Sequence, residues 1–542
     1  MNIMMLYFHS LKHLKLIQIF NRFEKQFRRL KKCECKFSIR HHTKAWMRFE
    51  VNDVSYFGER SFSFLNKKHD VVSWNDTNLE KLWLYNLHYF NELNSVGALS
   101  REEQLIGLVK CWIDENPPFF GNGWEPYPIS LRVVNWIKYF LSVDKQSSLV
   151  LDSLFQQVYA LEQQLEYHLL GNHIFANAKA LLFAGCFFEG EKADFWLEKA
   201  LKILDKEIVE QVLHDGGHFE LSPMYHNVIL LDMLDLYNLI NIYPHEELKK
   251  RRCQWGGVIE KMLEWGDYMS HPDGEVSFFN DAAMKISPPI NVLRKYAQLL
   301  GVESTVVNKS GLCGFEYKYL SYSGYVVVNN KALKAILDVA KVGPDYIPGH
   351  AHADTLSFEL SLFGYRVFVN SGTSLYGVNE ERLRQRKTAS HNTLEVDGAD
   401  SSEVWSGFRV ARRAYPTKPC IVKNNEALEF ACSHDGYSRF LNKVTHIRKW
   451  RFLENRIEII DSLKGQFTSA IVYYHLHPDI HVDTQGREIE LTLPTGKKIK
   501  IESNCDIELQ PSTWHPEFGV SIASQKFVIK LTQPSLEMIV RY

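Results

Sequence analysis

Gly349-His350-Ala351-His352-Ala353-Asp354 runs directly into Thr355-Leu356-Ser357-Phe358-Glu359-Leu360, a stretch with the composition of a β-strand. Alternate residues of an extended chain point to the same side, so we expect His350, His352 and Asp354 to share one face. Two imidazoles and a carboxylate on one face can bind a metal, or divide metal binding and proton transfer between them. The alternative is three polar residues on the solvated side of a strand.

The sequence on the N-terminal side of this stretch has a helical pattern. Between residues 79 and 300, apolar residues recur at three- and four-residue spacing, and turn sequences rich in Gly, Asn and Asp separate the segments. Helices of similar length joined by short polar turns predict antiparallel helix pairs in a solenoid or a closed (α/α) toroid. The expected helices span 102–113, 129–141, 149–170, 174–187, 195–213, 225–242 and 258–268.

After Gly311 the pattern changes to short, β-branched runs bounded by Gly, Asn, Asp or Pro. These runs, at 325–328, 335–339, 365–369, 393–396, 457–460 and 470–474, predict an antiparallel β-sandwich. The sequence therefore predicts an α+β multidomain protein. A helical and loop-rich leader covers 1–75, an (α/α) toroid with the catalytic residues covers 76–310, and a β-sandwich covers 311–542.

The composition is that of a globular protein without a strong overall charge. The 542 residues include 63 basic and 64 acidic side chains, so no global field attracts nucleic acid and we expect no nucleic-acid partner. The 13% of aromatic residues suits stacking on sugars, and thick β cores produce the same surplus. Nine scattered cysteines without repeated CxxC pairs argue against a disulfide framework and suit a reducing compartment.

The first 32 residues are the basis for predicting where the protein is located in the cell. Polar residues interrupt the apolar stretch 1–20, which makes it a poor signal peptide, and no uninterrupted apolar run reaches the length of a transmembrane helix. Residues 11–32 predict a basic amphipathic helix, which either docks on the protein or contacts a membrane surface peripherally. We therefore expect a cytoplasmic or membrane-peripheral protein.

Two expected helix starts carry polar residues. Asn172 in Gly171-Asn172-His173 and Ser222 in Ser222-Pro223-Met224-Tyr225-His226 are both suited to cap a helix. Unpaired N–H groups at such a start favour a bound carboxylate or phosphate. Trp124 and Tyr127 could line a groove between the helix starts, with core packing as the alternative.

These motifs, taken in order, resemble those of the heparinase II/III family of polysaccharide lyases. The set comprises the two helix starts with Asn177, then Gly349–Asp354, Phe368-Val369-Asn370-Ser371-Gly372-Thr373 and Ser390-His391-Asn392-Thr393. The resemblance spans roughly residues 80–480 and implies a toroid followed by a β-sandwich. It also implies β-elimination on a uronic-acid polysaccharide, which gives an acidic polysaccharide as the substrate. A periplasmic or secreted location is the family-based alternative.

Carried over by motif, the resemblance assigns four catalytic residues. Asn172 would neutralise the uronate carboxylate, because a carbanion at C5 beside an ionised carboxylate is very unfavourable. Tyr225 would protonate the leaving oxygen and could also serve as base, and His173 and His350 would be further proton-transfer groups. Trp124, Tyr127 and His226 would contact the substrate.

The resemblance further implies a structural zinc held by His352 and His391. The third ligand of that pattern is an Asp, and this chain has Asn370 at the position. A neutral amide is a poorer zinc ligand than a carboxylate, which weakens the expectation of a metal. No organic cofactor is expected.

Three other interpretations remain. A uronate C5-epimerase would use the same proton abstraction and return the proton to the opposite face. A non-catalytic polysaccharide-binding or assembly protein of capsule or surface-glycan production would need only aromatic rings and a few donors. A metal-dependent hydrolase would centre on His350, His352 and Asp354.

Overall fold

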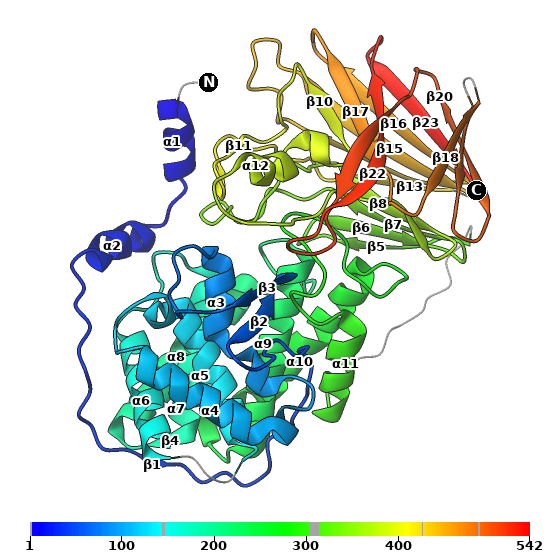
Figure 1. The fold of residues 1–542 in the computed structure, drawn as a ribbon. Coiled ribbons are helices and arrows are strands. Elements are labelled where there is room, and N and C mark those ends of the chain that lie inside the picture. The colour runs from blue at the N-terminus through cyan, green and yellow to red at the C-terminus, as the bar shows by residue number, and fades with distance from the viewer. Residues whose placement is uncertain (1–2, 144–146, 303–313, 425, 486–487) are drawn as a thin grey trace.

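The computed structural model describes residues 3–143, 147–302, 314–424, 426–485 and 488–542. A helical half lies below a β-rich half (Figure 1). The predicted boundary at 310/311 lies outside the described residues. The helices of the lower half are α3 (Lys81–Tyr89), α4 (Glu102–Glu115), α5 (Pro126–Phe140), α6 (Ser148–Glu162), α7 (Gly171–Phe187), α8 (Glu191–Gln211), α9 (Pro223–Ile242), α10 (Glu246–Met269) and α11 (Ile290–Leu299).

The helical half is organised around α7. Every residue of α7 except His173 is buried, and the helix contacts α5, α6, α8 and α9. A helix that is apolar around its whole circumference belongs in the interior, and here it completes the predicted (α/α) toroid. Because His173 alone escapes burial, the first turn of α7 is the part that can meet a ligand.

Two helix boundaries differ from prediction. α6 ends at Glu162 rather than at residue 170, because the chain then turns back and reaches Leu170 with a left-handed φ of 67°. α10 begins at Glu246 rather than at 258, since most of its first turns are polar and exposed and leave no apolar periodicity. Such boundaries depend on packing that the local pattern does not contain.

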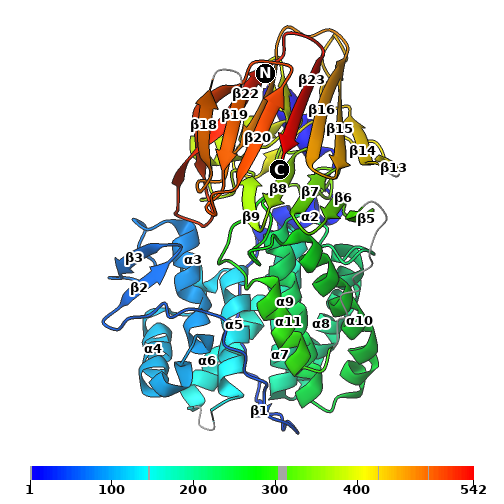
Figure 2. The ribbon, with the colours of Figure 1, turned by 90° about the vertical axis from the view of Figure 1, so that its right-hand side faces the viewer.

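The upper half is built from antiparallel sheets that share a core containing Leu337, Leu360, Trp450, Ile459 and Phe527. The first sheet, β5-β6-β7-β8-β9, lies between the toroid and the larger sheet in both views (Figures 1 and 2). Its strands are β5 (Glu316–Leu320), β6 (Tyr325–Asn329), β7 (Leu333–Asp338), β8 (Phe358–Leu362) and β9 (Tyr365–Phe368).

The other two large sheets complete the predicted sandwich. A four-stranded sheet has the order β10 (Leu394–Val396), β17 (Ala470–His475), β22 (Ile522–Lys530) and β21 (Glu508–Trp514). An eight-stranded sheet has the order β13 (Cys420–Lys423), β14 (Leu428–His434), β15 (Thr445–Leu453), β16 (Arg456–Lys464), β23 (Ser535–Arg541), β20 (Lys498–Ser503), β19 (Glu488–Thr492) and β18 (His481–Gln485).

The expected strand over 349–360 is largely wrong. Residues 349–357 form a loop, and β8 begins only at Phe358. Leu356 has a left-handed φ of 64°, and the Ser357 N–H donates to the Asp354 carbonyl at 2.8 Å, which closes a turn. The toroid also bonds to this loop, since the Asp281 N–H donates to the His350 carbonyl at 2.9 Å.

The remaining elements precede or connect the two halves. The expected helix over 11–32 is shorter in the structure, where α2 covers Leu16–Lys25 and a separate α1 covers Ile3–Leu11. Among the described residues, no helix has the length and apolar character needed to cross a bilayer. The short strands are β1 (Ser38–Ile39), β2 (Ser61–Phe64), β3 (Lys67–Asp70), β4 (Phe188–Glu189), β11 (Val404–Trp405) and β12 (Arg409–Val410), with α12 (Glu380–Arg386) in the upper half.

Candidate active site

The predicted catalytic residues meet where the toroid and the sandwich join. Asn172 and His173 lie in the first turn of α7, Tyr225 in the first turn of α9, and His350 in the loop before β8. The ring of His350 packs against that of Tyr225 at an interplanar angle of 36°, with 4.0 Å between centroids. Glu220 Oε2 lies 3.6 Å from His350 Nε2. The structure therefore brings two helix starts and one sandwich loop into a single cluster.

Glu220 also connects this cluster to α7. Its Oε1 lies 2.9 Å from where a Cβ on Gly171 would stand, so Gly171 permits the close approach of α7 to the carboxylate. Burial raises the pKa of Glu220, and the neighbouring His350 and His173 and the Asn172 backbone oppose that rise. Asn172 and His173 consequently share the surroundings of His350.

Unusual backbone angles occur just before the site residues. Leu170, Leu221 and Asn280 have φ values of 67°, 59° and 57°, a left-handed conformation that costs a leucine about 1–2 kcal/mol. Leu170 precedes α7, Leu221 precedes α9 with its cap Ser222, and Asn280 precedes Asp281. Strain of this kind persists only where surrounding contacts enforce it, and it often marks functional sites.

Asp281 is the centre of the polar network. Its fully buried carboxylate accepts from His350 Nδ1 and His352 Nε2, each at 2.8 Å, and from both terminal nitrogens of Arg382. Burial opposes its ionisation, but the Arg382 guanidinium and the two imidazoles hold the pKa of Asp281 well below its ordinary value. Asp281 therefore anchors both histidines.

Asp281 fixes the tautomer of His350. An ionised carboxylate only accepts hydrogen bonds, so the His350 nitrogen that faces it, Nδ1, carries the proton. In the neutral ring, Nε2 then carries the lone pair, as in a histidine that acts as general base. The side chain is 15% exposed, which leaves a path for a substrate proton.

Tyr225 has the properties of an acid. Its hydroxyl shares a hydrogen bond of 2.9 Å with the Tyr376 hydroxyl, and its backbone N–H donates to the cap Ser222 at 3.2 Å. Burial, with Tyr376 and Asp281 nearby, raises the pKa of Tyr225 well above its ordinary value, so the phenol keeps its proton. Tyr376 was not predicted from the sequence, because it lies just beyond the motif that ends at Thr373.

His173 is held by an ion pair. Its Nδ1 lies 3.1 Å from Glu166, whose other carboxylate oxygen accepts from the Asn177 amide at 3.0 Å. Burial opposes charge on His173, but the Glu166 carboxylate outweighs it and raises the pKa of the imidazole. Tyr127 packs against the His173 ring with 4.5 Å between centroids, in accord with its predicted place beside the substrate.

Two residues predicted to contact substrate lie elsewhere. Trp124 is 4% exposed, packs on Trp112, and donates its indole N–H to the Asn116 carbonyl. His226 is fully buried, with its Nε2 2.9 Å from the Met262 carbonyl, and burial lowers its pKa to about 3. Both point into the core, Trp124 from the turn just before α5 and His226 from the inward side of α9, so neither can contact a polymer in this structure.

The metal-dependent hydrolase interpretation loses its geometric basis. His350 and His352 do converge, but on Asp281 rather than with Asp354. The Asp354 carboxylate accepts from the Asn280 N–H at 3.0 Å and anchors the toroid loop. Across the described ranges, no three His, Cys, Asp or Glu side chains are grouped to hold a metal.

The residues predicted to bind zinc are adjacent but fit a metal poorly. His352 Nδ1 and His391 Nε2 face each other at 3.2 Å. The Asn370 amide is engaged on both sides, since Nδ2 donates to the Phe278 carbonyl at 2.9 Å and Oδ1 accepts from the Asn392 N–H at 3.1 Å. Facing imidazoles do not require a metal, because the same distance joins a second histidine pair in β14 and β15, His434–His446. A structural zinc stays a prediction, and these ligands would bind it weakly.

We expect Asn370→Asp to restore the missing ligand and tighten zinc binding at least about tenfold, because a carboxylate replaces a neutral amide. Metal content after dialysis, followed by zinc titration of the apo protein, measures the change. Unfolding temperature is recorded in parallel, since the variant loses the donor to Phe278. Stoichiometric zinc retained by the unsubstituted protein after dialysis would contradict the expected weak binding.

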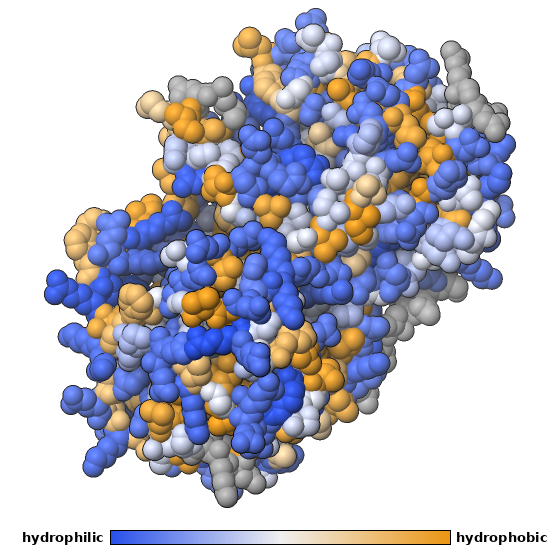
Figure 3. Space-filling model, in the orientation of Figure 1, coloured by the Kyte–Doolittle hydropathy of each residue, from blue (hydrophilic) through white to orange (hydrophobic). Residues whose placement is uncertain are grey.

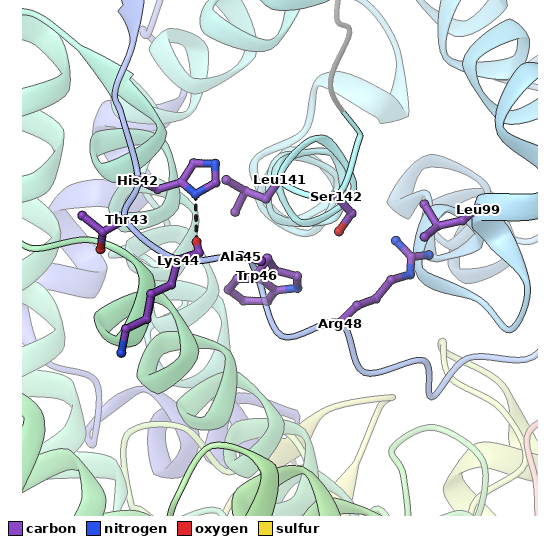
Figure 4. A pocket seen from close by; sticks show the side chains of 9 residues that line it. All are labelled: His42, Thr43, Lys44, Ala45, Trp46, Arg48, Leu99, Leu141 and Ser142. Carbon is purple, nitrogen blue, oxygen red and sulfur yellow. Dashed lines mark hydrogen bonds between the residues drawn. The ribbon is translucent and has the colours of Figure 1, made fainter.

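A hollow of about 590 Å³ in the surface lies away from these residues (Figure 4). It is lined by His42, Thr43, Lys44, Ala45, Trp46, Arg48, Leu99, Leu141 and Ser142. The His42 imidazole is engaged by the Lys44 carbonyl at 2.8 Å. No acid–base pair like that of His350 and Tyr225 lines the hollow, and we assign it no chemistry.

The fold and this cluster define a two-domain protein of the toroid-plus-sandwich class. A crystal structure of heparinase III superimposes with a TM-score of 0.68 at 19% identity, covering 97% of this chain and 88% of that one. The heparan sulfate lyase HepC from Pedobacter heparinus superimposes with a TM-score of 0.57 at 19% identity, covering 89% and 81%. These likenesses establish the fold.

Sequence comparison gives the family. Models of the heparinase II/III N-terminus and of the heparinase II/III-like C-terminal domain match residues 12–305 and 314–542. The chain belongs to the heparinase II/III family, as its motifs predicted.

Three individual relatives are 22–30% identical to this chain over the aligned residues. A heparin-sulfate lyase of Bacteroides stercoris is 30% identical over 44% of this chain and 38% of its own length, and one of Pedobacter heparinus is 28% identical over 71% and 59%. This chain therefore matches well under two thirds of the length of either relative. FtsZ-localized protein C of Caulobacter vibrioides is 22% identical over 82% of this chain and 78% of its own.

Proposed function

We propose that the protein is a polysaccharide lyase that cleaves a uronic-acid-containing polysaccharide by β-elimination. The observation that carries the proposal is the close pair of His350 and Tyr225, in which one ring nitrogen of His350 points away from Asp281 and the Tyr225 phenol retains its proton. Membership of the heparinase II/III family and the relatives named heparin-sulfate lyase support it.

In this mechanism the start of α7 binds the uronate carboxylate. Asn172 supplies a side-chain amide there, the free backbone N–H groups of the first turn add partial positive charge, and His173 adds a proton held in place by Glu166. Donors fixed in advance stabilise the charge that moves onto the carboxylate as the C5–H bond breaks.

His350 and Tyr225 then divide the two proton transfers. His350 Nε2 takes the C5 proton, the electron pair forms the C4–C5 double bond, and the bond from C4 to the linking oxygen breaks. Tyr225 donates its phenolic proton to that oxygen, which leaves as a sugar hydroxyl. The raised pKa of Tyr225 suits an acid better than a base, so we assign the base to His350.

Glu220 is well placed to serve His350. Its carboxyl group is buried beside the Asn172 backbone N–H, no side chain donates to it, and Oε2 faces the nitrogen that takes the C5 proton. A buried carboxyl group with so few donors is costly, so its place beside the base indicates a role in the reaction. We propose that Glu220 stabilises protonated His350 and receives its proton as the site resets.

Replacing Glu220 by Gln is expected to lower kcat about 10²-fold with little change in KM, because proton transfer is impaired while substrate contacts persist. The fold should tolerate the near-isosteric amide, and the unfolding temperature should not decrease. Steady-state kinetics and thermal unfolding measure the two effects. Equal losses in kcat and stability would indicate that Glu220 is structural.

An epimerase or a non-catalytic protein remains the alternative. An epimerase would use the same residues to abstract the C5 proton. The match to FtsZ-localized protein C, a relative whose name does not describe a lyase, extends over most of both chains and is the observation that favours the non-catalytic alternative.

A panel of uronic-acid polysaccharides, including heparan-like, alginate-like and bacterial capsule polymers, separates these possibilities. A lyase produces the ultraviolet absorbance of an unsaturated uronate. An epimerase incorporates solvent deuterium at C5 without chain cleavage. Binding of a polymer with neither outcome would overturn both catalytic proposals.

A further inference from the structure

Helix α2 attaches to the protein by its polar side. Gln18 is 2% exposed and donates to the Tyr346 carbonyl at 3.2 Å, and Lys25 Nζ lies 3.3 Å from the His168 ring nitrogen. Lys15, just before the helix, pairs with Glu210 and lies over the Tyr346 ring. These contacts occupy one side of the helix.

The apolar side of α2 faces solvent. At 100° per residue, Leu16, Ile19, Phe20 and Phe23 lie on the side opposite Gln18, and they are 84%, 51%, 67% and 65% exposed. Phe27, just beyond the helix, is 69% exposed. An amphipathic helix on a globular protein normally buries this side, so here the usual orientation is reversed.

Helix α1 extends the apolar surface. Leu6 is buried, and Ser10 is held by the Trp405 indole N–H at 3.1 Å, which fixes the helix to the upper half. Phe8 and Leu11 remain 60% and 49% exposed. In Figure 3 hydrophobic side chains gather over α1 and α2 on the left of the molecule, beside the junction of the two halves.

The charge around this surface is strongly positive. Residues 1–36 contain nine lysines and arginines against two glutamates, in a chain whose net charge is −1. Five of the nine fall in a basic run directly after α2, at Arg28, Arg29, Lys31, Lys32 and Lys36. Such a run next to an exposed apolar helix face matches the chemistry of an anionic lipid surface.

We propose that α1 and α2 dock the protein on an anionic membrane surface. The apolar side of α2 would enter the boundary of headgroups and acyl chains, and the basic run would contact anionic headgroups. A second copy of the chain fits less well, because a symmetric interface would bring two basic runs together. Since α2 contacts Tyr346 and Leu169, near His350 and Asn172, docking would place the candidate active site beside the membrane.

Co-sedimentation of the full chain with lipid vesicles tests the proposal. We expect binding to phosphatidylcholine vesicles that contain phosphatidylglycerol, weaker binding to phosphatidylcholine alone, and a decrease as salt is added. The F20S/F23S variant should lower the partition coefficient at least about tenfold, because two phenyl rings no longer leave water. Replacing Arg28, Arg29, Lys31 and Lys32 by Gln should reduce binding to the level seen on neutral vesicles.

The matched control is Leu441→Ser, which removes a fully exposed apolar side chain in the sandwich and should leave vesicle binding unchanged. Absence of binding by the unsubstituted protein would overturn the proposal, and so would equal binding by F20S/F23S. Self-association that F20S/F23S abolishes, measured by sedimentation velocity without lipid, would instead assign the surface to a second copy. These outcomes do not depend on lyase activity, which F20S/F23S should retain on soluble polymer.

Discussion

Replacing Tyr225 by phenylalanine is expected to lower kcat by about 10³-fold while leaving polymer affinity within about threefold. The phenylalanine ring keeps the packing against His350 but has no proton to give the leaving oxygen. Because the pKa of Tyr225 is raised, the unsubstituted enzyme holds that proton throughout the accessible pH range. Initial rates of unsaturated-product formation and calorimetric titration with the intact polymer measure the two quantities.

Tyr376→Phe is the matched control for this prediction. It removes the hydroxyl that shares a hydrogen bond with Tyr225 but leaves the proposed acid in place. We expect a loss of about tenfold, through poorer positioning of Tyr225. If the Tyr225 variant kept a tenth or more of the turnover, the acid would have to be another residue.

The second large effect is expected from Asp281→Asn. The substitution leaves the fully buried Arg382 guanidinium without its carboxylate, which costs about 3–5 kcal/mol of stability. It also removes the acceptor that orients His350, so kcat should fall by at least about 10²-fold even at temperatures where the variant stays folded. Chemical denaturation and kinetics at low temperature separate the two losses.

The sandwich provides a matched control in Asp461→Asn. Asp461 is also fully buried, accepts from Arg448 at 2.7 Å and from His446 at 2.6 Å, and His446 faces His434 as His352 faces His391. The control should lose similar stability but keep most of its kcat, because Asp461 contacts none of the catalytic residues and its partner Arg448 reaches the His350 loop only at the Leu356 carbonyl. A similar fall in kcat for both variants would show that the loss at Asp281 comes from weakened folding alone.

Local sequence was sufficient for much of the fold. The three- and four-residue spacing of apolar residues within 225–242 corresponds to α9, and the β-branched run 325–328 corresponds to β6. Both patterns were informative because they reflect which side chains of an element are buried. Ser222 caps α9 as its position before Pro223 predicted. The ordered motifs also gave Asn172, Tyr225 and His350, which the structure brings together.

Local sequence patterns did not predict the role of residues that depends on contacts with distant parts of the chain. Trp124 and His226 are found beside site residues in the chain but point into the core. The alternation of His350 and His352 predicted a strand, whereas a toroid segment about seventy residues away binds the loop that carries them. In the sequence, nothing distinguishes Glu220 from other polar residues that follow a turn.

The sequence by itself determined the two halves, the capped start of α9 and the ordered set of polar motifs, because these depend on spacing and on caps within a few residues. Only the tertiary structure decided that Asp281 joins His350, His352 and Arg382, that Glu220 faces the base, and that α2 exposes its apolar side. The reason is physical. Periodicity reports which side of an element is buried, whereas ionisation and hydrogen bonding depend on neighbours that only the folded chain supplies.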